Sequence, residues 1–153
     1  MADTKIAVVT GASRGLGRSM ALALARKGVE VIGTYHSNQA EADATAAAIE
    51  ALGRKALMVR LDTGDTAGFA PFAAELGRVL AKQWGRGTFD FLVNNAGIGI
   101  AAPFAETTEA EFDRLMNIHL KGVFFLTQRL LPLIADGGRI VNVSSGLARF
   151  SLP

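Results

Sequence analysis

Three glycines after a short apolar run are the first residues of the chain that could hold a ligand. The segment from Val8 to Gly17 reads V-V-T-G-A-S-R-G-L-G, with glycine at Gly11, Gly15 and Gly17 and a helical pattern after it. Glycine can take a positive φ and lets another group approach the backbone closely. The N–H groups that open the following helix would suit a phosphate or pyrophosphate. The spacing G-x-x-x-G-x-G differs from the usual G-x-G-x-x-G, so this motif alone also fits a plain strand-to-helix turn.

Pairs of polar or glycine residues follow each of the predicted strands. The pairs are Thr10-Gly11, Tyr35-His36, Asp62-Thr63, Asn94-Asn95 and Ser144-Ser145. Each pair alone could be ordinary loop sequence. The carboxyl ends of parallel strands share one edge of a sheet, and ligands of such sheets bind there. The five pairs together therefore predict a ligand-binding crevice.

The elements that must position these residues alternate strictly between strand and helix. Apolar runs predict strands at 6–10, 30–35, 56–61, 89–93 and 139–143. A stripe at Leu16, Met20 and Leu24 predicts the first helix, and a capping pair at Asn38 and Glu41 opens the second. The third helix is predicted at 69–83. This alternation indicates an α/β fold, a doubly wound parallel sheet with helices on both faces.

A long fourth helix is predicted between the last two strands. Thr108 and Glu111 form a capping box at its start. It runs to about residue 134 with a kink at Gly122, and Gly137-Gly138 stop it before the strand at 139–143.

Composition narrows the class of protein. The chain has 153 residues, half of them apolar, a net charge of +2, no cysteine and two histidines. This fits one globular domain and excludes a disulfide framework, a thiolate nucleophile and a cysteine or histidine metal cage, so no metal site is expected. The basic residues are scattered, which argues against a nucleic-acid partner. No signal layout or membrane-length apolar run is present, so a cytoplasmic protein without a membrane partner is expected.

Five motifs in order resemble the short-chain dehydrogenase/reductase family. They are T-G-A-S-R-G-L-G at 10–17, L-D-T at 61–63, N-N-A-G at 94–97, L-K-G-V-F-F at 120–125 and R-I-V-N-V-S-S at 139–145. The sequence looks nearest to the branch that includes 3-oxoacyl-carrier-protein reductases. The resemblance implies a single dinucleotide-binding Rossmann domain over 1–153, three layers α/β/α, with strands in the order 3-2-1-4-5. It also implies an NAD(P)-dependent oxidoreductase that moves hydride between the nicotinamide and a small carbonyl or secondary alcohol.

The resemblance also assigns roles to individual residues. Gly11, Gly15 and Gly17 would shape the turn around the cofactor pyrophosphate, and Ser13 and Leu16 would lie in the same loop against the cofactor. Asp62 would bind the adenine amine with Thr63 beside it. Asn94, Ala96 and Gly97 would line the adenosine-ribose side and support the central strand. Ser145 would donate to the substrate oxygen on which charge develops.

The choice of nicotinamide cofactor depends on the end of the second strand. An acidic residue there would bind a ribose 2′-OH and repel a 2′-phosphate, but Tyr35, His36, Ser37 and Asn38 include none. Arg14 in the glycine loop could pair with the phosphate, and His36 could add a donor. We therefore expect NADP rather than NAD, unless Arg14 is simply a solvated loop residue.

Two departures from the family pattern bear on catalysis. His119 stands where relatives usually carry the asparagine of a proton relay, and it could serve the relay or only pack the helix. The family's Tyr-x-x-x-Lys, roughly a dozen residues beyond the serine, is absent, since Tyr35 is the only tyrosine and no lysine follows Lys121.

The missing Tyr-x-x-x-Lys and the family resemblance lead to the following expectations. The domain is incomplete at its C-terminus, and residues 1–153 alone turn over negligibly. A full-length protein is expected to be a homo-oligomer, a dimer or tetramer, although the apolar stripe of the helix after Glu109 equally fits packing on the sheet. The alternative is a non-catalytic nucleotide-binding module.

Overall fold

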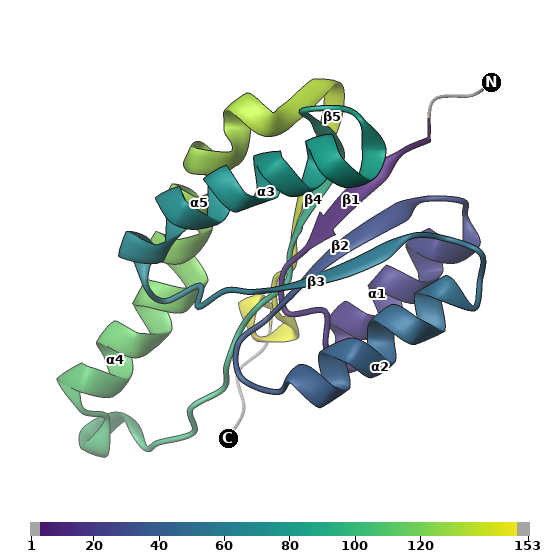
Figure 1. Ribbon diagram of the computed structural model, residues 1–153. Helices are drawn as coiled ribbons and strands as arrows, with labels where there is room; N and C mark the ends of the chain where they lie inside the picture. The colour runs from purple at the N-terminus through teal and green to yellow at the C-terminus, as the bar shows by residue number, and fades with distance from the viewer. Residues whose placement is uncertain (1–3, 150–153) are drawn as a thin grey trace.

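A parallel sheet of five strands forms the centre of the protein in the computed structural model, which describes residues 4–149 (Figure 1). The order is β3-β2-β1-β4-β5, and every neighbouring pair is parallel. The predicted order 3-2-1-4-5 is confirmed. The strands are β1 Ile6–Val9, β2 Glu30–Tyr35, β3 Ala56–Arg60, β4 Phe89–Asn94 and β5 Ile134–Asn142.

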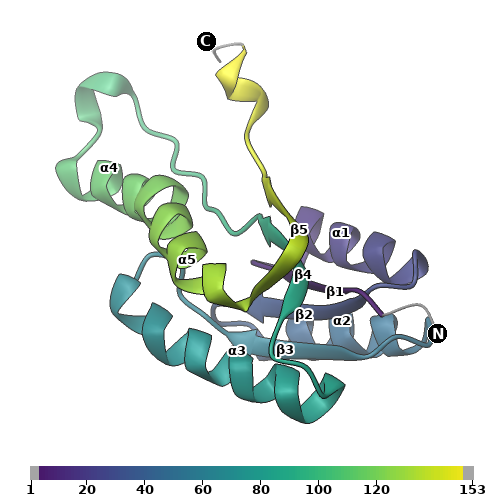
Figure 2. The ribbon, with the colours of Figure 1, turned by 90° about the horizontal axis from the view of Figure 1, so that it is seen from above.

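Helices cover both faces of the sheet, as predicted for a doubly wound fold. Figures 1 and 2 show α1 (Gly15–Arg26) and α2 (Gln39–Glu50) on one face and α3 (Phe69–Trp84) and α5 (Val123–Leu130) on the other. Alternate residues of β1 point to opposite faces, so Ile6 and Val8 join one apolar cluster while Ala7 and Val9 join the other.

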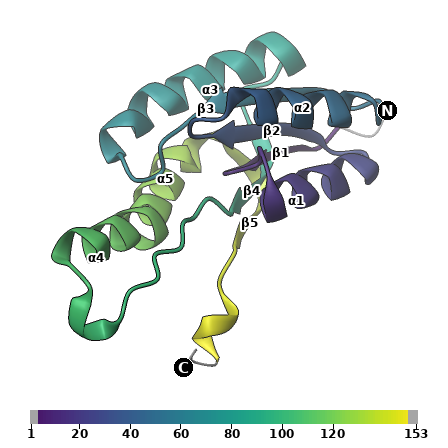
Figure 3. The same ribbon diagram turned by 90° about the horizontal axis from the view of Figure 1, so that it is seen from below.

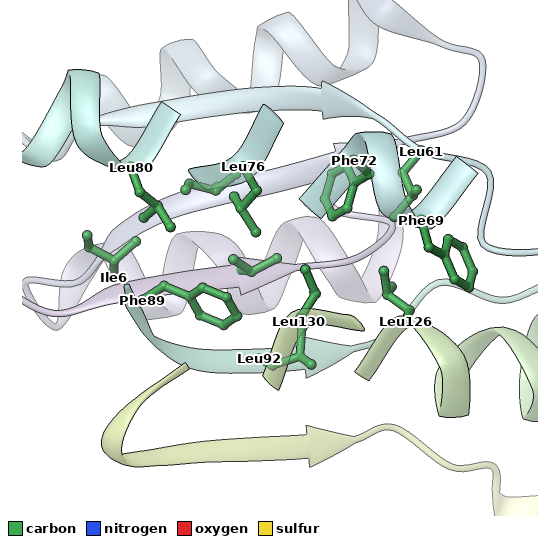
Figure 4. Packing of buried hydrophobic residues seen from close by; sticks show 12 residues of the cluster. Ile6, Leu61, Phe69, Phe72, Leu76, Leu80, Phe89, Leu92, Leu126 and Leu130 are labelled. Atoms are coloured by element: carbon green, nitrogen blue, oxygen red, sulfur yellow. The ribbon is translucent and has the colours of Figure 1, made fainter. Parts of the chain in front are cut away.

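The larger apolar cluster lies beneath α3 and α5. Figure 4 shows leucines from both helices, including Leu76, Leu80 and Leu130, converging on Phe89 and Leu92 of β4. These side chains are at most 1% exposed. Burial of these side chains stabilises the sheet, which carries the loops at the carboxyl ends of its strands.

The stripe at Leu16, Met20 and Leu24 predicted helix α1, but it is not the face that the helix buries. Gly17, Ala21 and Ala25 face the sheet, whereas Leu16 is 59% exposed and lies in the glycine loop region. Met20 and Leu24 are only half-buried at the flank of the smaller cluster. The helix packs so closely against the sheet and its loops that only small side chains fit between them.

The two predicted capping pairs differ in the structure. At α4 (Glu109–Met116) the capping box is complete, and hydrogen bonds from the backbone N–H and the hydroxyl of Thr108 lower the pKa of Glu111. At α2 only half of the capping box forms. Asn38 Oδ1 accepts from the Glu41 N–H at 3.1 Å, and the return bond from the Asn38 N–H to the Glu41 side chain is not made. The Glu41 Oε2 atom is buried and has no hydrogen-bond partner within residues 4–149.

The long fourth helix is divided, and its predicted end is wrong. A π-helical segment, Asn117–Gly122, joins α4 to α5, at the place where a kink was expected. Gly122 packs on the Thr63 carbonyl, where a Cβ would not fit. Pro132 lies in a short 3-10 turn, Leu131–Leu133, because proline lacks the N–H that an α-helix needs.

The last strand consequently starts earlier than predicted. Ile134 already pairs with Phe89, and the register then shifts so that Arg139 pairs with Phe91. Gly137, at φ +75°, lies within this irregular part of β5 and does not stop a helix. No helix within residues 4–149 is long and apolar enough to cross a membrane.

A buried carboxylate ties the amino ends of two strands. Asp90 Oδ1 accepts from Lys5 Nζ at 2.8 Å, and Oδ2 accepts from the Ile6 N–H at 3.0 Å and from Arg86 Nη1 at 3.2 Å. Burial raises the pKa of Asp90, but these hydrogen bonds and the charges of Arg86 and Lys5 outweigh it and lower the pKa below its usual value.

Candidate functional site

A cavity of about 700 Å³ opens at the carboxyl ends of the strands. It lies where the strand order reverses between β1 and β4, the position at which such sheets bind ligands. Its far wall comes from α4, which projects beyond the sheet (Figure 3). The predicted cofactor residues that line it are Gly11, Ser13, Arg14, Gly15, Leu16, Gly17, His36, Asp62, Thr63, Ala96 and Gly97.

The glycine turn leaves the start of α1 open to the cavity. Gly11 has φ +66° and Gly15 has φ +55°, the left-handed region that favours glycine. A Cβ on Gly11 would lie 2.9 Å from the Ala96 Cα, and one on Gly17 would overlap the Gly11 carbonyl oxygen. Arg14 at the N-cap makes no side-chain capping hydrogen bond, and the first turn holds no acidic residue. The first N–H groups of α1 are therefore placed for an anion.

Asn95 is a site residue that the sequence placed at the crevice edge but to which it assigned no role of its own. Its Nδ2 donates to the carbonyls of Thr10 at 3.0 Å and Gly11 at 3.2 Å. The Thr10 hydroxyl in turn accepts from the backbone N–H groups of Asn95 at 2.9 Å and Ala96 at 3.0 Å. These bonds hold the loop after β4 against the glycine turn. The signal was its place inside the N-N-A-G motif.

Asn94 does not line the cavity. It is 5% exposed, and its Nδ2 donates to Thr127 Oγ1 at 3.1 Å and to Asn142 Oδ1 at 2.8 Å. Asn94 thus joins β4 to α5 and to β5. Of its two expected roles, the structure shows support of the central strand.

Charged and polar side chains gather where β2 and β3 end. Asp62 Oδ1 accepts from the Gly64 N–H at 2.8 Å, and its Oδ2 lies 3.4 Å from His36 Nε2. Arg14, Ser37 and Asn38 line the same cavity, and Glu41 does so from the first turn of α2. No acidic residue stands at positions 33–38.

His119 packs on the backbone beside the cavity. Its Nε2 lies 2.7 Å from the Ile98 carbonyl oxygen and 3.2 Å from the Ile98 nitrogen. One ring nitrogen can either donate to the carbonyl or accept from the N–H, so the tautomer decides which bond forms. The ring edge also covers Gly97, where a Cβ would lie 2.6 Å from His119 Cε1.

Ser145 lies outside the cavity, after β5. Its hydroxyl accepts from the Leu147 N–H at 3.2 Å and caps the short 3-10 turn Gly146–Ala148. Within residues 4–149 no hydrogen bond joins Ser145 to His119. The structure brings the cofactor candidates other than Asn94 together around the cavity.

Comparison with known families identifies one family. A model described as short chain dehydrogenase matches residues 5–153. Among curated relatives, an uncharacterized oxidoreductase of Methylorubrum extorquens is 39% identical over 151 residues, covering 99% of this chain and 58% of its own length. Versicolorin reductase 1 of Aspergillus parasiticus is 34% identical over 146 residues, covering 95% of this chain and 53% of its own. The chain therefore spans between half and three-fifths of these relatives.

Solved structures show the same similarity. The landomycin C-6 ketoreductase LanV with bound NADP and rabelomycin superposes with a TM-score of 0.93 at 40% identity, covering 97% of this chain and 61% of that one. The promiscuous reductase LugOII, which catalyses keto-reduction in lugdunomycin biosynthesis, has a TM-score of 0.92 at 41% identity, covering 99% of this chain and 63% of that one.

Proposed function

The chain belongs to the short-chain dehydrogenase family, and from this premise we propose that the protein is an NADP-dependent oxidoreductase. It would transfer hydride between the nicotinamide and a small carbonyl or secondary alcohol. LanV, a relative solved with bound NADP, is a ketoreductase, and LugOII catalyses keto-reduction, which supports this reaction class. Their activities do not favour the alternative of a purely nucleotide-binding module.

The observation that carries the proposal is the uncapped glycine turn that opens α1 into the cavity. The residues present fit a dinucleotide. Gly11 and Gly17 leave a cradle that a Cβ would fill, and no acidic first-turn residue repels a pyrophosphate. We propose that the N–H groups near Gly15 and Leu16 hold the pyrophosphate and that Ser13 lies against it.

The adenosine end of the cavity favours NADP, the cofactor that carries a 2′-phosphate. Arg14 and Ser37 offer donors to a 2′-phosphate, and the end of β2 carries no carboxylate that would repel it. Asp62 Oδ2 would accept from the adenine amine, with Thr63 beside it. When bound, the cofactor would supply the hydride, while the protein would supply position and electrostatics.

Two residues would act around the substrate. We propose that Ser145 donates to the substrate oxygen where charge develops. The contact of His119 Nε2 with the Ile98 backbone supports a positioning role, in which the ring fixes the loop at Gly97 and Ile98.

An exposed apolar stripe supports self-association. Phe112, Met116, Leu120 and Phe124 recur every four residues along α4, the π segment and α5, and are between 38% and 60% exposed. The acidic residues Glu109 and Asp113 lie near the start of this stripe, and the basic Lys121 lies near its end. If two copies packed antiparallel through the stripe, the acidic end of one would face the basic end of the other. We propose a homo-oligomer through this face. Sedimentation of the protein and of Leu120→Glu would test it.

Cofactor binding is tested by fluorescence titration of the chain with NADPH and NADH at equal ionic strength. We expect NADPH to bind at least about tenfold more tightly, because the 2′-phosphate adds charge-assisted hydrogen bonds. Tighter binding of NADH would refute the cofactor assignment. Binding of neither would refute the proposed function.

A further inference from the structure

His36 and Asp62 form a pair across two neighbouring loops of the cavity. His36 follows β2 and Asp62 follows β3, and their Nε2 and Oδ2 atoms lie 3.4 Å apart. Their side chains are 65% and 52% exposed, so solvent screens the pair and its contribution to folding is small. A ligand group that binds either side chain more strongly can therefore replace this weak pair.

The two side chains differ in how firmly they are held. Asp62 is anchored by the bond from the Gly64 N–H to Oδ1, so Oδ2 keeps its position. The His36 carbonyl accepts from Arg60 Nε at 3.1 Å, which fixes the backbone of His36 but not its ring. Rotation of the His36 ring would therefore leave Asp62 in place with Oδ2 free.

This inference rests on the proposed function, in which Asp62 binds the adenine amine and the 2′-phosphate lies near the end of β2. We propose that His36 exchanges partners when NADP binds. In the free protein it pairs with Asp62, and in the complex it donates to the 2′-phosphate and frees Asp62 Oδ2 for the adenine amine. The 2′-phosphate thereby releases the group that recognises adenine.

The charges around the pair are consistent with this exchange. Arg14 lines the same cavity and would bring a phosphate near, while Glu41 lines it from α2 and disfavours unpaired negative charge there. A donor that can leave Asp62 offsets the repulsion between Glu41 and the phosphate. Ligands without the 2′-phosphate offer His36 no anion at the 2′ position of the ribose and must compete with it for Asp62.

The test compares two ligands that differ only in the 2′-phosphate, 2′,5′-ADP and 5′-AMP, by calorimetry on the full chain. In His36→Ala the Kd of 2′,5′-ADP should rise about fivefold to tenfold, the range for a lost charge-assisted bond at an exposed site. The Kd of 5′-AMP should not rise, because its competitor for Asp62 is gone. The preference of the protein for 2′,5′-ADP over 5′-AMP should therefore fall.

A second variant should move the ratio the other way. Asp62→Ala removes the adenine contact for both ligands but frees His36 for the phosphate, so 5′-AMP should lose more affinity than 2′,5′-ADP. Lys27→Ala, which removes an exposed cation at the end of α1 outside the cavity, should leave the ratio unchanged.

Three results would overturn the exchange. If His36→Ala weakens both ligands equally, His36 only positions Asp62. If it weakens neither, His36 contacts no ligand. If both variants shift the ratio in the same direction, the two residues do not compete. Wild-type protein that binds both ligands would uphold nucleotide binding in each of these cases, and binding of neither would end both proposals.

Discussion

Replacing Gly17 by alanine tests whether the glycine turn is built by packing. A Cβ at this position would overlap the Gly11 carbonyl oxygen and Asn95 Nδ2 and would lie 2.9 Å from the Gly11 carbonyl carbon. Since backbone atoms make up most of this contact, α1 or the turn must move. Such overpacking costs about 1 to 3 kcal/mol. Displacing Asn95 from its two carbonyl acceptors adds about 1 to 3 kcal/mol.

Alanine's higher helix propensity offsets about 1 kcal/mol of this loss. The free energy of unfolding should therefore fall by about 1 to 5 kcal/mol, which lowers Tm by roughly 2 to 20 °C for a chain of this size. The N–H groups that face the cavity move with α1, so NADPH affinity should fall by at least about tenfold. Urea denaturation followed by circular dichroism measures the first effect, and fluorescence titration measures the second.

Gly87→Ala is the matched control. Gly87 has no heavy atom within 4 Å of an added Cβ, and its φ lies outside the left-handed region. This variant should be as stable as the wild type or slightly more stable, because alanine restricts the unfolded chain. If Gly17→Ala matched Gly87→Ala within about 0.5 kcal/mol and bound NADPH normally, the packing argument would be wrong.

Three further changes probe other contacts. The folded-state pKa of Asp90 is lowered, so its stabilisation is present above the unfolded pKa of about 3.9 and is lost as pH falls through the folded value. Asp90→Asn should cost about 2 to 4 kcal/mol at pH 7 and flatten the loss of stability below pH 5 in urea titrations, and an unchanged slope would contradict this. Arg14→Leu should raise the Kd of NADPH about tenfold and that of NADH by less than about twofold, whereas equal losses would show that Arg14 does not read the 2′-phosphate. Gly97→Ala should destabilise the protein by about 1 to 3 kcal/mol because its Cβ meets the His119 ring, and His119→Ala should restore most of that loss in the double variant unless the clash is with another group.

Periodicity and turn residues predicted the sheet because parallel topology constrains it strongly. Buried strands such as β1 are short apolar runs, and right-handed crossovers leave few ways to order five of them. The stripe at Leu16, Met20 and Leu24 predicted helix α1 but not which of its faces is buried, for a physical reason. A pattern of large apolar residues identifies what can be buried, while Gly17, Ala21 and Ala25 are buried because the helix lies too close for anything larger. The distance between the helix and the sheet depends on tertiary packing, which the local sequence pattern does not show.

The start of β5 was missed for a different reason. Gly137 and Gly138 resemble a helix stop, but the helix has already ended at Pro132. Ile134 pairs with Phe89 and Arg139 pairs with Phe91, because a register shift accommodates the extra residues of β5 between Ile134 and Arg139. Bulges of this kind depend on the partner strand, so local sequence does not reveal them.

The two asparagines after β4 explain how a correct motif gave an incomplete site. Successive residues of a strand point to opposite sides, so Asn94 faces Thr127 and Asn142 while Asn95 faces the glycine turn. Asn94 holds the end of β4 to its outer neighbours, and Asn95 holds it to the turn after β1. The cavity lies at the seam between β1 and β4, so its shape depends on both bonds although only Asn95 lines it. The motif located the seam, but only the pleat of the strand decides which asparagine reaches the cavity.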